Sequence, residues 1–225
     1  MRYDGSASEL VPLMLEALAQ SLIRGDAEAV SRLTRQAIDA GLSPALVLND
    51  GLLAGMAVIG KRFRENEIFL PQVLVAARAM KAGIAHLEPL LAAAGVKPAG
   101  KFLVGTVQGD IHDIGKNLVS IMLQGAGFQV IDLGINVRAQ QFIAGIEVHQ
   151  PDIVGMSALL TTTMLHMRTN IAQFTAAGVR DQVKVMVGGA AVTRRFAADI
   201  GADAYGRSAA DAVDKALALL VPPPA

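Results

Sequence analysis

The spacing of apolar positions changes near residue 95 and divides the chain into two parts. From Leu10 to Leu22 apolar residues recur every three or four positions, which is the spacing of one face of a helix. Beyond residue 100, short apolar runs rich in β-branched residues alternate with helical stretches. The pattern therefore predicts two domains, over residues 1–95 and 96–225, with the Gly- and Pro-containing segment 95–100 as the linker.

Helix-starting residues mark the elements of the first domain. Asp26 predicts the cap of a helix over 27–40, and Ser43 predicts the cap of the next helix over about 45–64. A further helix is expected from residue 71 to about 94. Helices joined by such short links pack as antiparallel neighbours, so we expect a helical bundle.

The second domain has the alternation of strands and helices that builds a parallel sheet. It predicts an α/β fold with a doubly wound, five-stranded parallel sheet of the flavodoxin-like or Rossmann-like kind and right-handed crossovers. The expected strands cover residues 101–107, 128–132, 152–157, 183–187 and, with a weaker pattern, 202–205, before a helix over 208–220.

The composition limits the kinds of site and partner that the chain can have. Its 20 acidic and 20 basic residues cancel, which argues against nucleic acid and an anionic membrane as partners. It contains no cysteine, which excludes disulfides, thiolate zinc sites and cysteine nucleophiles. No uninterrupted apolar run approaches the roughly 18 residues of a membrane span. We expect a cytoplasmic protein.

The segment from Gly109 to Asn117 follows the first strand and contains the arrangement of a metal ligand. His112 lies at the carboxyl end of that strand, where open α/β sheets bind ligands. Asp110 can accept a hydrogen bond from one imidazole nitrogen while the other nitrogen faces a metal. Gly115 has no side chain to obstruct an approaching group.

The loops after the third and fourth strands are uncharged. The third strand ends at Ser157 and is followed by three consecutive threonines, and the fourth is followed by Gly188 and Gly189, which allow close approach of a bulky ligand. One histidine alone binds free zinc poorly, because zinc needs three or four protein ligands. One histidine is sufficient when the metal arrives already held by a macrocycle.

The motifs Asp-x-His-x-x-Gly, Ser-x-Leu and Gly-Gly, at these separations, resemble the cobalamin-binding module. The resemblance is closest to methionine synthase and to the small corrinoid proteins of methyltransferase systems, and it covers nearly the whole chain. Residues 62–72 resemble the helical cap that covers the upper face of the cofactor in this family. The implied cofactor is cobalamin, as methylcobalamin or a related corrinoid.

The resemblance implies three residues with catalytic roles. His112 replaces the dimethylbenzimidazole of the cofactor as the lower cobalt ligand, and Asp110 forms a hydrogen bond to His112. Thr163 stands where a serine ends this relay in methionine synthase, and its extra methyl group restricts the rotamer.

The resemblance also implies further cofactor contacts from the motif, from the loops along the nucleotide tail and from the cap. Asp113 is also expected as a helix cap, and the pair of glycines after the fourth strand also suits a plain turn. The three cap residues, Phe63, Leu70 and Val73, have a spacing that is equally compatible with core positions in the helical domain. The implied contacts are Gly109, Asp110, Ile111, His112, Asp113, Gly115, Ser157, Leu159, Thr161, Thr163, Gly188, Gly189, Ala190, Tyr205, Gly206 and Ala209, with Phe63, Leu70 and Val73 in the cap.

The function that the resemblance implies is that of a methyl carrier, cycling between methyl-Co(III) and Co(I). Its partners would be a substrate-specific methyltransferase, a second methyltransferase with a pterin or thiol acceptor, and a reductive activator. The alternatives are the cobalamin-binding subunit of a radical mutase, a cobalamin sensor module, and a flavodoxin-type module without a corrin.

Overall fold

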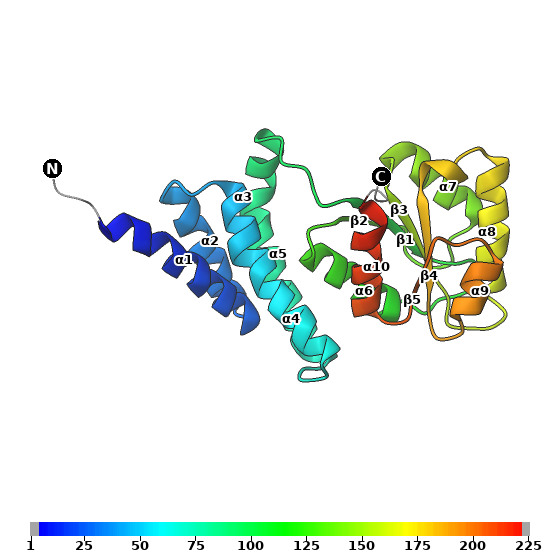
Figure 1. Cartoon of the computed structure of the whole chain (residues 1–225), viewed down its shortest axis with the longest axis horizontal. Helices are drawn as coiled ribbons and strands as arrows, with labels where there is room; N and C mark the ends of the chain where they lie inside the picture. The colour runs from blue at the N-terminus through cyan, green and yellow to red at the C-terminus, as the bar shows by residue number, and fades with distance from the viewer. Residues whose placement is uncertain (1–4, 222–225) are drawn as a thin grey trace. The chain divides into compact units, whose positions relative to one another are not determined.

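The computed structural model describes residues 5–221, which form two compact units divided between Lys97 and Pro98 (Figure 1). The change of sequence pattern predicts this division two residues earlier, after residue 95. The first unit is helical and the second contains the sheet, as the sequence pattern predicts.

The helical unit begins its helices at the expected capping residues. The Asp26 carboxylate accepts a hydrogen bond from the Ala29 backbone N–H at 2.9 Å, and the Ser43 hydroxyl accepts one from the Leu46 N–H at 3.2 Å. Both caps were predicted from the sequence. The elements are α1 (Gly5–Ile23), α2 (Ala27–Asp39), α3 (Pro44–Leu46), η1 (Val47–Leu53), α4 (Ala54–Arg64) and α5 (Leu70–Ala93).

The stretch Pro44–Arg64 differs from the simple helix expected there, because its middle part, η1, is π-helical. Within residues 5–221, it is also the one helix long and apolar enough to cross a membrane by length and composition. Its residues Leu52, Met56 and Ile59 are buried in the helical unit. A core helix of a bundle meets the same criteria, so this helix is weak support for a membrane span.

The second unit confirms the predicted parallel sheet. All five strands pair in parallel in the order β2-β1-β3-β4-β5, which is the flavodoxin-like order. The elements are β1 (Lys101–Thr106), α6 (Ile114–Gly125), β2 (Gln129–Asp132), α7 (Ala139–His149), β3 (Ile153–Ser157), α8 (Leu165–Ala176), η2 (Arg180–Gln182), β4 (Lys184–Gly188), α9 (Arg194–Asp199), β5 (Ala204–Gly206) and α10 (Ala209–Leu220).

Helices cover both faces of the sheet, with α6 and α10 on one face and α7, α8 and α9 on the other (Figure 1). On the α6/α10 face, the strand register places four small residues in one row at the carboxyl edge: Thr106, Ser157, Gly188 and Gly206. Small side chains in this row leave space between the sheet and the two helices at the edge where parallel sheets bind ligands.

Candidate functional site

The loop between β1 and α6 is held by hydrogen bonds on both of its sides. The Gly109 N–H donates to the side-chain oxygen of Asn136 at 2.8 Å, and the Asn136 N–H donates to the Asp110 carbonyl at 3.0 Å. Gly109 has a φ of +79°, a conformation that glycine adopts without strain. On the other side, the Thr106 hydroxyl donates to the His112 carbonyl at 3.1 Å. These bonds fix the backbone that carries Asp110 and His112.

The Asp110 carboxylate is completely buried and accepts hydrogen bonds on both oxygens. Its Oδ1 accepts from the His112 backbone N–H at 3.0 Å and lies 2.7 Å from His112 Nδ1. Its Oδ2 accepts from the Leu159 N–H at 2.8 Å and from the Thr163 hydroxyl at 2.6 Å. The carboxylate therefore connects the loop after β1 to the loop after β3.

These donors keep Asp110 ionised. Burial alone raises the pKa of this carboxyl, but the hydrogen bonds from Thr163, His112 and Leu159 outweigh burial and hold the pKa of Asp110 well below its usual range. An ionised carboxylate can only accept, so His112 Nδ1 is the donor in this contact. The neutral imidazole then carries its lone pair on Nε2.

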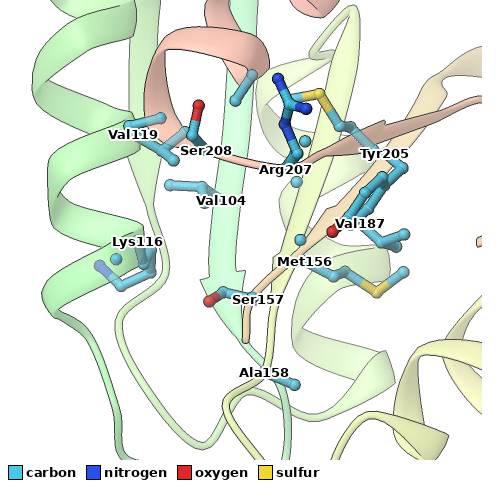
Figure 2. Close-up of a pocket in the computed structure, with 18 of the residues that line it drawn as sticks. Val104, Lys116, Val119, Met156, Ser157, Ala158, Val187, Tyr205, Arg207 and Ser208 are labelled. Carbon is cyan, nitrogen blue, oxygen red and sulfur yellow. The ribbon is translucent and has the colours of Figure 1, made fainter. Parts of the chain in front are cut away.

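The His112 side chain is 45% exposed, although its Nδ1 partner is buried. The imidazole also lines a cavity of about 450 Å³ between the sheet and helices α6 and α10. Figure 2 shows residues around this cavity, with Lys116 and Val119 on α6, Val104 on β1 and Ser208 before α10. The arrangement leaves Nε2 available to bind a metal.

The cavity brings together many of the residues singled out in the sequence. They come from the loop after β1, from the ends of β3, β4 and β5, and from the start of α10. The predicted contacts that line the cavity are His112, Gly115, Ser157, Leu159, Gly188, Gly189, Ala190, Tyr205, Gly206 and Ala209.

Glycine is required for different structural reasons at three positions that line the cavity. A Cβ on Gly189, whose φ is +124°, would lie 1.9 Å from the Ala158 carbonyl oxygen, and a Cβ on Gly188 would lie 2.9 Å from the Gly206 oxygen. The close backbone packing alone accounts for glycine at these two positions. A Cβ on Gly115 would meet no atom within 4 Å. Gly115 therefore keeps space open beside the cavity.

Comparison with known proteins identifies the family. The B12 binding domain matches residues 100–214, and a second B12 binding domain family matches residues 14–88. A corrinoid protein of Desulfitobacterium hafniense (strain Y51) is 41% identical over 214 residues, which cover 94% of this chain and 99% of that protein. Trimethylamine corrinoid protein 2 of Methanosarcina acetivorans is 46% identical over 197 residues, which cover 87% of this chain and 91% of that protein. The chain belongs to the corrinoid proteins of methyltransferase systems.

Solved structures support the assignment of this chain to the corrinoid proteins. The methanol:cobalamin methyltransferase complex MtaBC from Methanosarcina barkeri matches with a TM-score of 0.83 and 31% identity, over 97% of this chain and 85% of that chain. A cobalamin-binding protein from Desulfitobacterium hafniense DCB-2 matches with a TM-score of 0.73 and 31% identity, over 92% of this chain and 98% of that chain. The predicted cobalamin or related corrinoid cofactor is thereby confirmed.

The residues of the corrinoid protein fit such a cofactor. Within residues 5–221, no three side chains of the His, Cys, Asp or Glu type gather as a metal site, so a free metal ion lacks the ligands that it needs. One imidazole with a free Nε2 suits a metal whose other ligands come from a macrocycle. The open space at Gly115 and the adjacent cavity provide room for the rest of the group.

Several predicted contacts of the corrinoid protein do not line the cavity. Asp110 and Thr163 lie buried behind His112, and Gly109 shapes the loop. Ile111 is 69% exposed, and Thr161 is also exposed. Any contact of Ile111 or Thr161 with the cofactor therefore lies outside this cavity.

Asp113 stands at the N-cap position of α6, but its side chain forms no capping bond. Its carboxylate instead accepts from the Asn117 side-chain amide at 3.0 Å. The prediction that the Asp113 side chain caps this helix is therefore wrong, because the Asp113 backbone (φ −116°, ψ −12°) lacks the extended conformation from which an N-cap side chain reaches the first turn.

The cap residues differ in what they can offer to a ligand. Val73 is completely buried in the helical unit, whereas Phe63 and Leu70 are half-buried. Phe69, which suits a core or a lid by the same pattern, is 65% exposed. Val73 therefore belongs to the core of that unit and presents no surface to a cofactor, which corrects the lid prediction for this residue.

Sequence reasoning missed apolar side chains beside His112. Ile114 is 72% exposed and follows the histidine by two residues, and Leu160 is 43% exposed beside Leu159, whose N–H binds Asp110. Exposed apolar groups around a site mark a surface that a ligand or partner covers. The signal in the sequence was the isoleucines and leucines within otherwise polar loops.

Sequence reasoning also missed Lys116, whose side chain lines the cavity although it is almost fully buried. Its ammonium pairs with Asp132 and donates to the Asn117 side chain at 2.7 Å. This pair connects the first turn of α6 to the end of β2. A charged residue at an otherwise apolar helix position was the signal.

We expect the Thr163 hydroxyl to control the proton affinity of Asp110. Replacing Thr163 with valine keeps the shape but removes the donor that lowers the pKa of Asp110 most. The Asp110 pKa should therefore rise in Thr163→Val, and the serine variant should retain the low value. Carboxyl resonances followed by NMR during acid titration measure both, and equal pKa values in the two variants would contradict the relay.

We expect a side chain at Gly115 to block the cofactor without harming the apoprotein. A Cβ at Gly115 meets no atom within 4 Å, and alanine and leucine are both better helix formers than glycine in the first turn of α6. Gly115→Leu should thus keep the thermal midpoint of the apoprotein and weaken cobalamin binding by about tenfold or more, since it fills space that the ligand needs. Gly115→Ala serves as the smaller control, and full affinity in the leucine variant would place the cofactor elsewhere.

Proposed function

We propose that this corrinoid protein carries a methyl group from a substrate-specific methyltransferase to a second methyltransferase with a pterin or thiol acceptor. The names of its relatives, which are trimethylamine and dimethylamine corrinoid proteins, support the first half of this route. So does the match to a methanol:cobalamin methyltransferase complex. The observation that carries the proposal is His112, held through Nδ1 by a buried carboxylate at the mouth of a cavity.

When bound, the corrinoid supplies a cobalt centre that accepts and releases a methyl group. His112 would hold the cobalt through Nε2, while Asp110 keeps the imidazole in the tautomer that has its lone pair there. The hydrogen bond from Nδ1 to the ionised carboxylate would also strengthen the imidazole as a metal ligand. The Asp110–His112 pair would thus set how firmly the imidazole binds the metal.

Other residues around the site would bind the nucleotide tail of the cofactor and shield the cofactor from water. The cavity that contains Ser157, Gly188 and Gly206 would take the nucleotide tail of the cofactor. The exposed apolar groups Ile114 and Leu160 would shield the bound cofactor from water. A lid role for Phe63 and Leu70, a reductive activator as partner and a location in the cytoplasm stay predictions.

The alternatives from the sequence analysis gain no specific support. A mutase subunit and a sensor share the same histidine motif, but the relatives named above belong to methyl-transfer systems. For a methyl carrier, two classes of methyl donor are then open, because methylated amines and methanol both occur among the relatives' names.

The test is transfer of an isotopically labelled methyl group in a reconstituted system. The loaded protein is combined with methylamine or methanol methyltransferases and with an acceptor enzyme, and label is followed from donor to acceptor. The proposal expects transfer that requires this chain and that fails with His112→Gly. Transfer at the same rate without the chain would contradict the proposal. So would the absence of transfer with every pairing of donor and acceptor enzymes.

A further inference from the structure

The inner part of the cavity beneath His112 is apolar. Phe102 and Val104 of β1, Met186 of β4 and Ala212 of α10 line it with 0–4% of their surface exposed. Gly155 of β3 lies between Val104 and Met186 in register, and a Cβ there would come within 2.4 Å of the Phe102 ring. Glycine at this position lets the Phe102 ring lie directly against β3, and the walls of the inner cavity are aliphatic or aromatic.

Few polar groups remain to serve a ligand in this inner part. The backbones of β1, β3 and β4 are paired with one another along the floor, so their N–H and C=O groups are used. The buried ammonium of Lys116 is engaged by Asp132 and Asn117. The other polar side chains of the lining are half-buried or exposed and thus lie nearer the opening: Ser157, Tyr205, Arg207 and Ser208.

We infer that the cavity selects corrinoids whose tail ends in a benzimidazole over those whose tail ends in a purine. The inference rests on the proposed binding of the tail in this cavity. A purine such as adenine carries an exocyclic amine and several ring nitrogens, which would lose water and gain no partner among the inner walls. A dimethylbenzimidazole has fewer polar atoms and two methyl groups, whose burial against Val104 and Met186 is favourable.

The test compares three corrinoids on the full chain: cobalamin, its adenine-tailed analogue and cobinamide, which lacks the nucleotide. Equilibrium binding is followed by absorbance. We expect cobalamin to bind about tenfold or more tightly than the adenine analogue, because buried polar groups without partners cost affinity. Equal affinities for the two would overturn the inference and leave the proposed function intact. Failure of all three to bind would overturn both.

A variant tests whether the apolar wall causes the selectivity. Met186→Gln places hydrogen-bonding groups in the inner wall at similar volume, and it should reduce the preference for cobalamin while leaving cobinamide affinity unchanged. Met122→Gln is the matched control, because Met122 is buried on α6 but does not line the cavity. A preference unchanged in Met186→Gln would contradict the inference. If that variant does not fold, the comparison of corrinoids on the natural chain decides.

Discussion

Replacing His112 with glycine is expected to abolish the absorption spectrum of histidine-ligated cobalamin in the loaded protein. The imidazole is the one side chain that offers a free ring nitrogen at the mouth of the cavity. Loss of a supporting group alone lowers metal affinity about 10–100-fold, so loss of the ligand itself should cost at least as much. Methyl transfer in the reconstituted system should slow accordingly.

The apoprotein should tolerate the His112→Gly change. The imidazole is almost half exposed, and the backbone N–H at this position still reaches Asp110 Oδ1. His149→Gly is the control, since His149 lies exposed at the end of α7, away from the cavity. An unchanged spectrum in the His112 variant, or the same loss in the control, would show that His112 is not the ligand.

Replacing Asp110 with asparagine is expected to destabilise the sheet unit even without cofactor. The carboxylate accepts from Thr163, Leu159 and His112, and an amide nitrogen in place of one oxygen would leave at least one buried donor unpaired. Such a loss costs about 1–3 kcal/mol in the free energy of unfolding. Urea unfolding of the apoprotein measures the change. Asp113→Asn, on a half-buried carboxylate of the same loop, is the control and should change stability much less.

The pH dependence of stability gives the Asp110 prediction a second readout. The pKa of Asp110 is lowered in the folded protein, so its contribution to stability is present above the unfolded pKa of about 3.9 and is lost as pH falls below that value toward the folded pKa. Asp110→Asn lacks this contribution and should show a flatter loss of stability over the same acidic range. Parallel pH profiles of the natural chain and the variant would contradict the role given to the hydrogen bonds.

The sequence predicts those parts of the site that depend on neighbours along the chain. Asp110 and His112 are two residues apart at the end of a strand, so their contact follows from the motif. Thr163 lies in a different loop, and only the resemblance to a family pointed to it. The row of small residues from Thr106 to Gly206 arises from register across four strands, which local patterns do not encode.

In the helical unit, the lid role predicted for Val73 and the regular helix predicted over residues 45–64 both proved wrong. An apolar residue at helical spacing serves a core or a lid equally well, and Val73 proved to be core because neighbouring helices bury it completely. The π-helical segment η1 was also not predicted. There Gly51 packs so closely on α1 that a Cβ would lie 2.6 Å from Leu18. The apolar spacing within one helix does not predict tertiary packing of this kind.

The most direct test of the account is electron paramagnetic resonance of cobalt(II) cobalamin bound to the protein. The protein is prepared with histidine carrying the heavy stable isotope of nitrogen, while the cofactor keeps the ordinary isotope. If Nε2 of His112 binds the cobalt, each nitrogen-split triplet becomes a doublet in the labelled protein. A triplet that stays unchanged would show that the benzimidazole of the cofactor remains on the metal, and it would contradict the central claim.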